Sequence, residues 1–196
     1  MKKNGFIIGL LFLTSMQLHA NTFVSEDVIT EPTPQRFSIC FNTTCETVQE
    51  LSLQQQQWKK VQQLFQRSID SAAIEREVIK RAIALLEDMV GRLAGTSNDL
   101  AENAGGAREG QMDCIDESTN TTIYLTMMQS EGLLKFHQVS DIATRGYFIT
   151  GWPHSSAVIK ETASSQFYVV DSWFLHNGEQ PYIIPLTEWQ NGWRPG

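Results

Sequence analysis

The sequence predicts an α+β fold, with helices in the first part of the chain and an antiparallel sheet after them. Two observations predict this. Apolar residues recur at intervals of three, four and seven between residues 48 and 93, as they do on one face of a helix. After residue 145 the apolar residues follow a period of two in short stretches that turns separate, as in antiparallel strands. Helices followed by strands in this way are typical of α+β domains.

The composition is that of a folded domain. The 196 residues are 41% hydrophobic, 10% aromatic and 19% charged, which excludes a disordered chain. The length suits one domain with its own hydrophobic core. The formal charge is −7, from 15 basic and 22 acidic residues. This acidity argues against nucleic acid or an anionic membrane surface as a partner.

The first 20 residues are typical of a secretory signal peptide. Lys2 and Lys3 precede an apolar stretch at residues 6–13, and Ala20 suits the position before cleavage. The stretch is about half the ~20 residues that a membrane-spanning helix needs. We therefore expect an exported protein, periplasmic or secreted, with no stable membrane anchor after cleavage. A retained anchor is the alternative.

Residues 21–45 are expected to form an extended, loosely held leader. Cys40 and Cys45 lie five apart near its end. In an oxidising compartment this spacing favours a small disulfide loop. No second Cys/His pair accompanies them, which disfavours zinc. Cys114 is left without a partner, and a lone cysteine is either a reactive thiol or a small buried apolar residue.

A helical hairpin is predicted for residues 46–95. Its first helix begins at about Glu46, and its second, stronger helix covers residues 69–94 and ends at Gly95. The apolar faces are expected to pack on the rest of the domain. The remaining residues, 96–196, are expected to form the α+β core. Its predicted elements are a helix at 114–130, strands at 147–151, 156–160 and 167–172, an edge strand at 182–184, and a C-terminal clasp that carries Trp189 and Trp193.

Three residues of the core form a candidate catalytic group. Cys114 lies where a glycine-containing loop meets a predicted helix, and a helix N-terminus lowers the pKa of a thiol, as does a nearby imidazolium. His154 begins one strand and Asp171 ends the next, so they are plausible neighbours across a hairpin. In that position Asp171 would orient His154, which would accept the thiol proton. A structural role is the alternative for each residue, and His137 is a second candidate histidine.

The run Asp113-Cys114-Ile115-Asp116, followed by a strand-borne His154 and by Asp171 after a Tyr-Val-Val strand, resembles the transglutaminase-like cysteine peptidase superfamily over residues 105–175. The resemblance implies a papain-like core, in which the nucleophile begins a helix that packs on an antiparallel sheet. It also implies an oxyanion donor just upstream of Cys114, for which Gln111 is the candidate beside the Cys114 backbone N–H.

The sequence departs from the superfamily at two points near the nucleophile. Ile115 stands where many members have an aromatic residue. Asp113, Asp116 and Glu117 surround the nucleophile and would raise its pKa if they faced it.

These features predict an exported cysteine-dependent amide or peptide-bond hydrolase or acyltransferase. Its partner would be a peptide or protein substrate, with the cell envelope as the nearest source, and no cofactor or metal is expected. The alternative is a non-catalytic binding or adaptor module that docks through the helical hairpin. A metal site built from Cys114, His154 and Asp113 lacks a recognisable ligand repeat. No Cys-x-x-Cys pair supports redox catalysis.

Overall fold

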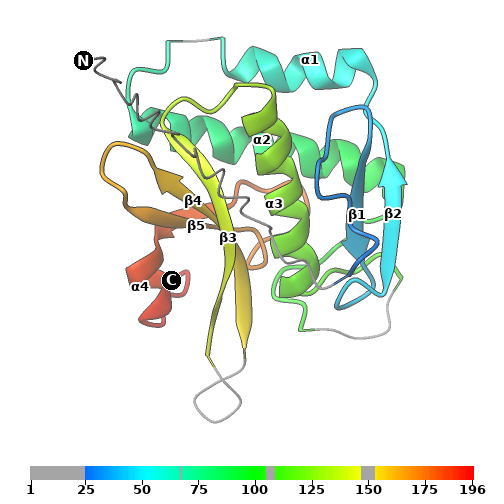
Figure 1. Cartoon of the computed structure of the whole chain (residues 1–196). Coiled ribbons are helices and arrows are strands. Elements are labelled where there is room, and N and C mark those ends of the chain that lie inside the picture. Colours follow the sequence, from blue (N-terminus) through cyan, green and yellow to red (C-terminus); the bar gives the residue numbers. More distant parts are fainter. Residues whose placement is uncertain (1–24, 67, 105–108, 147–152) are drawn as a thin grey trace, which may run out of the picture.

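A computed structural model of the chain describes residues 25–66, 68–104, 109–146 and 153–196. The predicted signal peptide (1–20) and the predicted strand at 147–151 lie outside these residues. The described part is an α+β structure with four helices and two antiparallel sheets (Figure 1). The sheets have two and four strands, and each is a simple antiparallel arrangement of consecutive strands.

The smaller sheet corrects two predictions. Strand β1 (Phe37–Phe41) pairs with β2 (Thr47–Leu51), from Phe37 opposite Leu51 to Phe41 opposite Thr47. All five residues of β1 are buried, so the prediction of a loosely held leader is wrong for this segment. The prediction of a helix from Glu46 is also wrong, because the chain returns along β1 as a strand. The spacing of three between Val48 and Leu51 had indicated a helix, but pairing with β1 determines the local structure.

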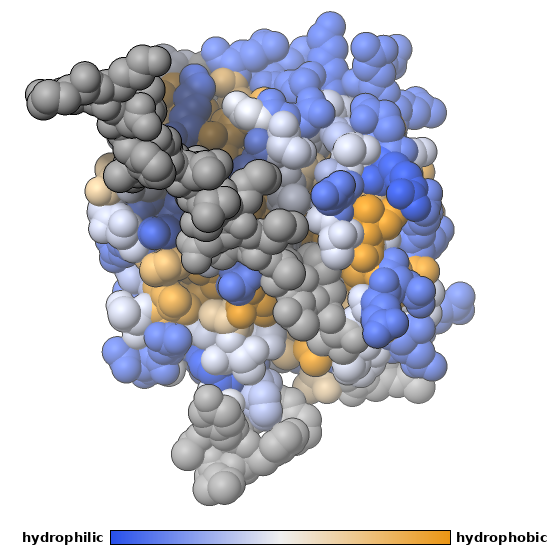
Figure 2. All heavy atoms as spheres, viewed as in Figure 1, coloured by the Kyte–Doolittle hydropathy of each residue, from blue (hydrophilic) through white to orange (hydrophobic). Residues whose placement is uncertain are grey.

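Helices α1 (Gln55–Leu64) and α2 (Ala72–Ala94) lie side by side (Figure 1). Helix α1 buries Trp58 and Val61 and otherwise presents glutamines and lysines, so the upper edge of the molecule is hydrophilic (Figure 2). The burial of so few residues fits a short helix that covers one edge of the core.

Helix α2 confirms the stronger of the two predicted helices. The Ser71 side chain caps its N-terminus, and Gly95 ends it with φ +82°, a conformation that favours glycine. Its buried face contains the apolar residues Ile79, Ile83, Leu86 and Val90, whereas Leu93 is 45% exposed.

Helix α3 (Cys114–Ser130) confirms the predicted helix at 114–130 and lies between the two sheets (Figure 1). It contacts β1 on one side and β3, β4 and β5 on the other. Most of its residues are therefore buried around the whole circumference, including polar ones such as Thr121 and Thr122. This central position fixes the helix on both sides, and with it the residue at its N-terminus.

The larger sheet has the order β3-β4-β5-β6, with every neighbouring pair antiparallel. Its strands are β3 (His137–Arg145), β4 (His154–Glu161), β5 (Phe167–Asp171) and β6 (Tyr182–Pro185). Strands β4, β5 and β6 confirm predictions, whereas β3 begins at the end of residues 133–137, for which the sequence predicts a short extended or irregular piece. Its irregular polar pattern hides the strand, and the register with β4 shifts between Ser140 and Ala143. The short helix α4 (Leu186–Gln190) follows β6 and buries Trp189 completely.

In the parts of the chain that the structure describes, no helix has both the length and the apolar character needed to cross a membrane.

Candidate functional site

Cys114 is the first residue of α3, and the neighbouring carboxylates explain why the helix begins there. Asp113 is the N-cap, and its Oδ1 accepts hydrogen bonds from the backbone N–H groups of Ile115 (2.9 Å) and Asp116 (3.0 Å). In return, Asp116 Oδ2 accepts from the Asp113 N–H at 3.1 Å, which completes a capping box. The Asp113 carboxylate thus takes up the second and third amides of the helix. The first amide, that of Cys114, is not bonded by this carboxylate and acts on the Cys114 thiol itself.

A pocket of about 460 Å³ contains both Cys114 and His154. It lies where the N-terminus of α3, the beginning of β4 and the segment after β5 meet. The residues that line it are Thr43, Thr44, Asn103, Ala104, Asp113, Cys114, Ile115, Arg145, Pro153, His154, Trp173, Phe174 and Arg194. Residues far apart in the sequence therefore form one concave site around the lone thiol.

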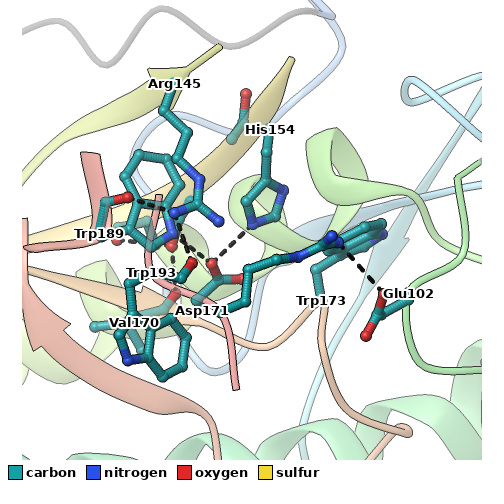
Figure 3. A network of polar contacts seen from close by, with 12 residues as sticks. Glu102, Arg145, His154, Val170, Asp171, Trp173, Trp189 and Trp193 are labelled. Atoms are coloured by element: carbon teal, nitrogen blue, oxygen red, sulfur yellow. Dashed lines mark hydrogen bonds and ion pairs between the residues drawn. The ribbon is translucent and has the colours of Figure 1, made fainter. Parts of the chain in front are cut away.

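His154 is held by Asp171 (Figure 3). The distance from His154 Nε2 to Asp171 Oδ2 is 2.8 Å, and both side chains are buried. Trp189 Nε1 donates to the same oxygen at 2.7 Å. Because an ionised carboxylate only accepts hydrogen bonds, this arrangement fixes the proton of a neutral His154 on Nε2 and leaves the lone pair on Nδ1. Nδ1 is buried and has no hydrogen-bond partner among the described residues.

Aromatic rings surround the His154 imidazole. The ring centroids of Trp173, Phe174 and Trp189 lie 4.7, 5.3 and 5.5 Å from that of His154. Phe174 and Trp189 are buried, whereas Trp173 is half-buried and donates from Nε1 to the Asn103 carbonyl at 2.7 Å. These rings keep water away from the His154–Asp171 hydrogen bond, which strengthens it.

Arg145 binds the C-terminal segment beside this site through hydrogen bonds and a contact with an aromatic ring. Its guanidinium donates to the carbonyl oxygens of Trp189 and Trp193, the latter at 2.8 Å, and lies 4.5 Å from the centroid of the Trp189 ring. Arg145 therefore ties the residues after β6 to the end of β3, beside His154. Their distance in sequence from the three predicted residues explains why sequence reasoning had assigned them no part in orienting Asp171.

The structure does not bring Gln111 into the pocket wall. Its side chain is buried, donates to the Asn98 carbonyl at 2.8 Å and accepts from the Leu100 N–H at 3.3 Å. Gln111 thus holds the loop that follows α2, and its role as an oxyanion donor stays a prediction. The second candidate histidine, His137, also lies outside the pocket wall. Its Nδ1 is 2.8 Å from Glu75 Oε2 in a fully buried pair that ties β3 to α2.

A disulfide loop supports the first turn of α3. Cys40 and Cys45 form the expected disulfide, which is compatible with an exported protein. The four residues Asn42 to Cys45 all have positive φ, so successive backbone N–H groups point to one side of the loop. Thr44 donates to Asp113 Oδ2 at 3.0 Å, and Thr43 and Cys45 donate to Asp116 at 2.9 and 2.6 Å. The loop therefore holds the two carboxylates that flank Cys114.

Removal of this disulfide is expected to impair Cys114 more than it impairs the fold. In the Cys40→Ser/Cys45→Ser double variant, the strained loop loses its closure, and Asp113 and Asp116 lose donors. We expect the melting temperature to fall by an amount equivalent to roughly 2–4 kcal/mol, and the reaction of Cys114 with acyl probes to slow at least tenfold at a temperature where the variant is folded. An unchanged rate in the folded variant would show that the loop does not position Cys114.

The thiol of Cys114 is a neutral group at rest. Burial raises its pKa, the Ser155 backbone N–H lowers it, and the charges of Asp113 and Asp171 raise it further, so that the net change is upward. This corrects the expectation of a lowered pKa, because burial and the acidic neighbours outweigh the hydrogen bonds from the Ser155 and Cys114 backbone N–H groups. A nucleophile of this kind needs a base at the moment of attack, and His154 is the basic side chain in the pocket whose lone pair is unoccupied.

Three buried carboxylates, Glu87, Asp99 and Glu117, form a group that sequence reasoning did not predict, although it named Glu117 as an acid near the nucleophile. Glu87 accepts from Ser172 Oγ at 2.8 Å and from the Gly178 N–H at 3.0 Å. Burial raises the pKa of Glu87 to about 7 and that of Asp99 to about 6. Burial together with the neighbouring acids raises the pKa of Glu117 well above its usual range. No sequence motif marks the three acids, because they come from α2, the following loop and α3.

No protein-family model, curated protein or solved structure matches this chain. The chemistry of the site therefore has to be inferred from its own geometry.

Proposed function

We propose that this protein is an exported thiol enzyme that transfers acyl groups, with an amide or peptide bond as the bond that is broken. Cys114 is the nucleophile, His154 the general base and acid, and Asp171 the group that orients His154. One observation carries the proposal. A lone thiol at a helix N-terminus shares a pocket with a histidine whose Nε2 is bound to Asp171 and whose buried Nδ1 has no partner among the described residues.

The first half of the reaction forms a thioester. Cys114 Sγ attacks the carbonyl carbon of the substrate while its proton passes to His154 Nδ1. The tetrahedral oxyanion accepts a hydrogen bond from the Cys114 N–H, the amide that the Asp113 carboxylate does not occupy. The C–N bond then breaks as His154 returns the proton to the leaving amine.

The second half releases the enzyme. Water or a second amine attacks the thioester, His154 accepts one proton from it, and the C–S bond breaks to give a carboxylic acid, which ionises to solvent, or a new amide. The proton then returns to the Cys114 thiolate. Both outcomes use the same residues, so hydrolysis and transfer belong to one proposal.

The architecture and the sequence support this proposal. Helix α3 begins at the nucleophile and packs on an antiparallel sheet that carries His154 and Asp171 on adjacent strands. That is the arrangement implied by the resemblance to the transglutaminase-like superfamily. Peptides of the cell envelope are the substrates that an exported enzyme would meet.

An activated ester tests the proposal without a known substrate. The full-length chain after signal removal is mixed with p-nitrophenyl acetate, and the released p-nitrophenolate and the intact mass are followed together. We expect a stoichiometric burst and one acetyl group, located on Cys114, and neither in Cys114→Ala. Because Cys40 and Cys45 are bridged, they do not compete. A burst that persists in Cys114→Ala, or no acetylation of the folded protein, would contradict the proposal and favour a non-catalytic binding module.

A further inference from the structure

Two arginines form part of the pocket that contains the thiol. Arg145 ends β3 and is the cross-strand partner of His154, and Arg194 comes from the C-terminal segment. The chain has a net charge of −7, but the pocket wall contributes two positive charges near the thiol. Neither arginine is needed for the acyl transfer described above.

Asp113, which lines the pocket, and Asp171, which holds His154, are engaged with other donors. Asp113 accepts hydrogen bonds from the helix amides and from Thr44, and Asp171 accepts from His154 and Trp189. Among the described residues no carboxylate lies within 4.0 Å of Arg145. The segments outside them contain no Asp or Glu.

Arg194 has only a weak partner. Its guanidinium is 3.5 Å from Glu102, and both side chains are more than half exposed, where an ion pair contributes little. Arg194 lies 5.8 Å from the centroid of the Phe174 ring. Arg145 has a pKa lowered by burial and, despite the opposing effect of Asp171, by the charge of Arg194, so the two cations act on each other. A bound anion would relieve this repulsion.

We infer that the substrate of this site carries a carboxylate close to the acyl group that Cys114 attacks. This inference rests on the proposed function and adds the class of substrate, an anionic peptide or acyl compound. Arg194 binds the carboxylate, because a guanidinium presents two parallel donors that match its two oxygens. Arg145, held by the Trp189 and Trp193 carbonyls, adds fixed positive charge. Trp173 and Phe174 supply an apolar wall for the rest of the substrate.

Two alkylating reagents of nearly equal size test the inference. Iodoacetate carries a carboxylate and iodoacetamide is neutral, and both alkylate only a thiolate. Their rate ratio at one pH is therefore independent of the thiolate fraction of Cys114. In the full mature chain we expect this iodoacetate-to-iodoacetamide ratio to exceed that of a small free thiol by about fivefold to tenfold, as one charge-assisted contact would give.

Three variants make the test specific. Arg194→Gln should lower the ratio to about that of the free thiol, and Glu102→Gln, which frees Arg194, should raise it. Arg36→Gln is the matched control, because it removes the same charge from an exposed Arg36–Glu50 pair outside the pocket and should leave the ratio unchanged.

The outcomes separate the inference from the proposed function. If both reagents alkylate Cys114 but the ratio is that of a free thiol and does not change in Arg194→Gln, the carboxylate inference is wrong and the acyl-transfer proposal stands. If neither reagent alkylates Cys114 in the folded chain, the acyl-transfer proposal fails and the inference fails with it.

Discussion

Replacing Asp171 with alanine is expected to slow the acylation of Cys114 by about 10²–10³-fold, whereas asparagine should slow it only about tenfold, because Trp189 holds the acceptor oxygen in place. Asparagine is expected to be the milder change because Asp171 Oδ2 accepts hydrogen bonds from both His154 Nε2 and Trp189 Nε1. In Asp171→Asn the Trp189 N–H selects the rotamer that places the amide oxygen at this point. The asparagine therefore still holds the Nε2 proton of His154, and only the negative charge is lost.

The burst of p-nitrophenolate measures this difference, with intact mass as the readout for Cys114. Thermal unfolding of each variant is the control for folding, because alanine leaves the buried Trp189 N–H without its acceptor. If asparagine and alanine slow the burst equally while both variants are folded, the charge of Asp171 rather than its orientation of His154 would be the important property. If neither slows it, Asp171 has no part in the reaction.

The three buried carboxylates Glu87, Asp99 and Glu117 are expected to make the protein less stable as the pH rises from 5 to 8. The pKa of Glu87 is raised to about 7 and that of Asp99 to about 6, both above the usual range for an unfolded chain. Over this pH range the folded state binds more protons than the unfolded state, so the free energy of unfolding falls with increasing pH. The contribution of Glu87 alone is on the order of 3 kcal/mol, present at low pH and lost as the pH passes 7.

Thermal unfolding of the wild type at pH 5 and pH 8, compared with Glu117→Gln, measures this effect. Glu117 is the acid that keeps its proton longest and hydrogen-bonds to Asp99, and glutamine reproduces that donor without a charge. We expect the fall in melting temperature between the two pH values to be smaller in Glu117→Gln. Glu131→Gln, which changes an exposed acid at the end of the same helix, is the matched control. A wild type whose stability rises between pH 5 and pH 8 would contradict this account.

The parts of the fold that the sequence predicted well are those determined by local signals. Helix α3 has an acidic N-cap, Asp113. Helix α2 has a serine N-cap, apolar residues at helical spacing, and Gly95 at its C-terminal end. The strands β4 and β5 are short runs rich in β-branched and aromatic residues with turns between them. Such signals act within a few residues, so they can be read without knowing the fold.

The parts that were predicted wrongly depend on contacts between distant residues. Val48 and Leu51 have helical spacing, but the chain reverses after β1 and β2 pairs with it. The chain reverses at the disulfide loop, and the backbone N–H groups of this loop bond the carboxylates of Asp113 and Asp116. These two residues lie far away in the sequence, so a local pattern does not reveal the reversal. Local propensity is a weak guide wherever tertiary pairing of this kind competes with it.

The candidate site shows the same division. Cys114, His154 and Asp171 were identified from residue type, order and the ends of predicted elements, and the structure places His154 against Asp171 and both Cys114 and His154 in one pocket. The contributions of Trp189 and Arg145 were missed, because they reach the site from the C-terminal segment and the end of β3. The raised pKa of Cys114 follows from burial and from two carboxylates, which sequence spacing cannot orient.

The pH dependence of Cys114 alkylation by iodoacetamide, compared between wild type and His154→Gln, tests most directly whether His154 activates the thiol. With His154 as the base, we expect the wild type to react at pH 7 although its thiol has a raised pKa, because His154 takes up the thiol proton and so supplies the thiolate that iodoacetamide alkylates. His154→Gln should react about 10²-fold more slowly at that pH and should recover only as the pH rises through the titration of the thiol itself. Identical pH profiles for the two proteins, with both folded, would contradict the assignment of Cys114 and His154 as a catalytic pair.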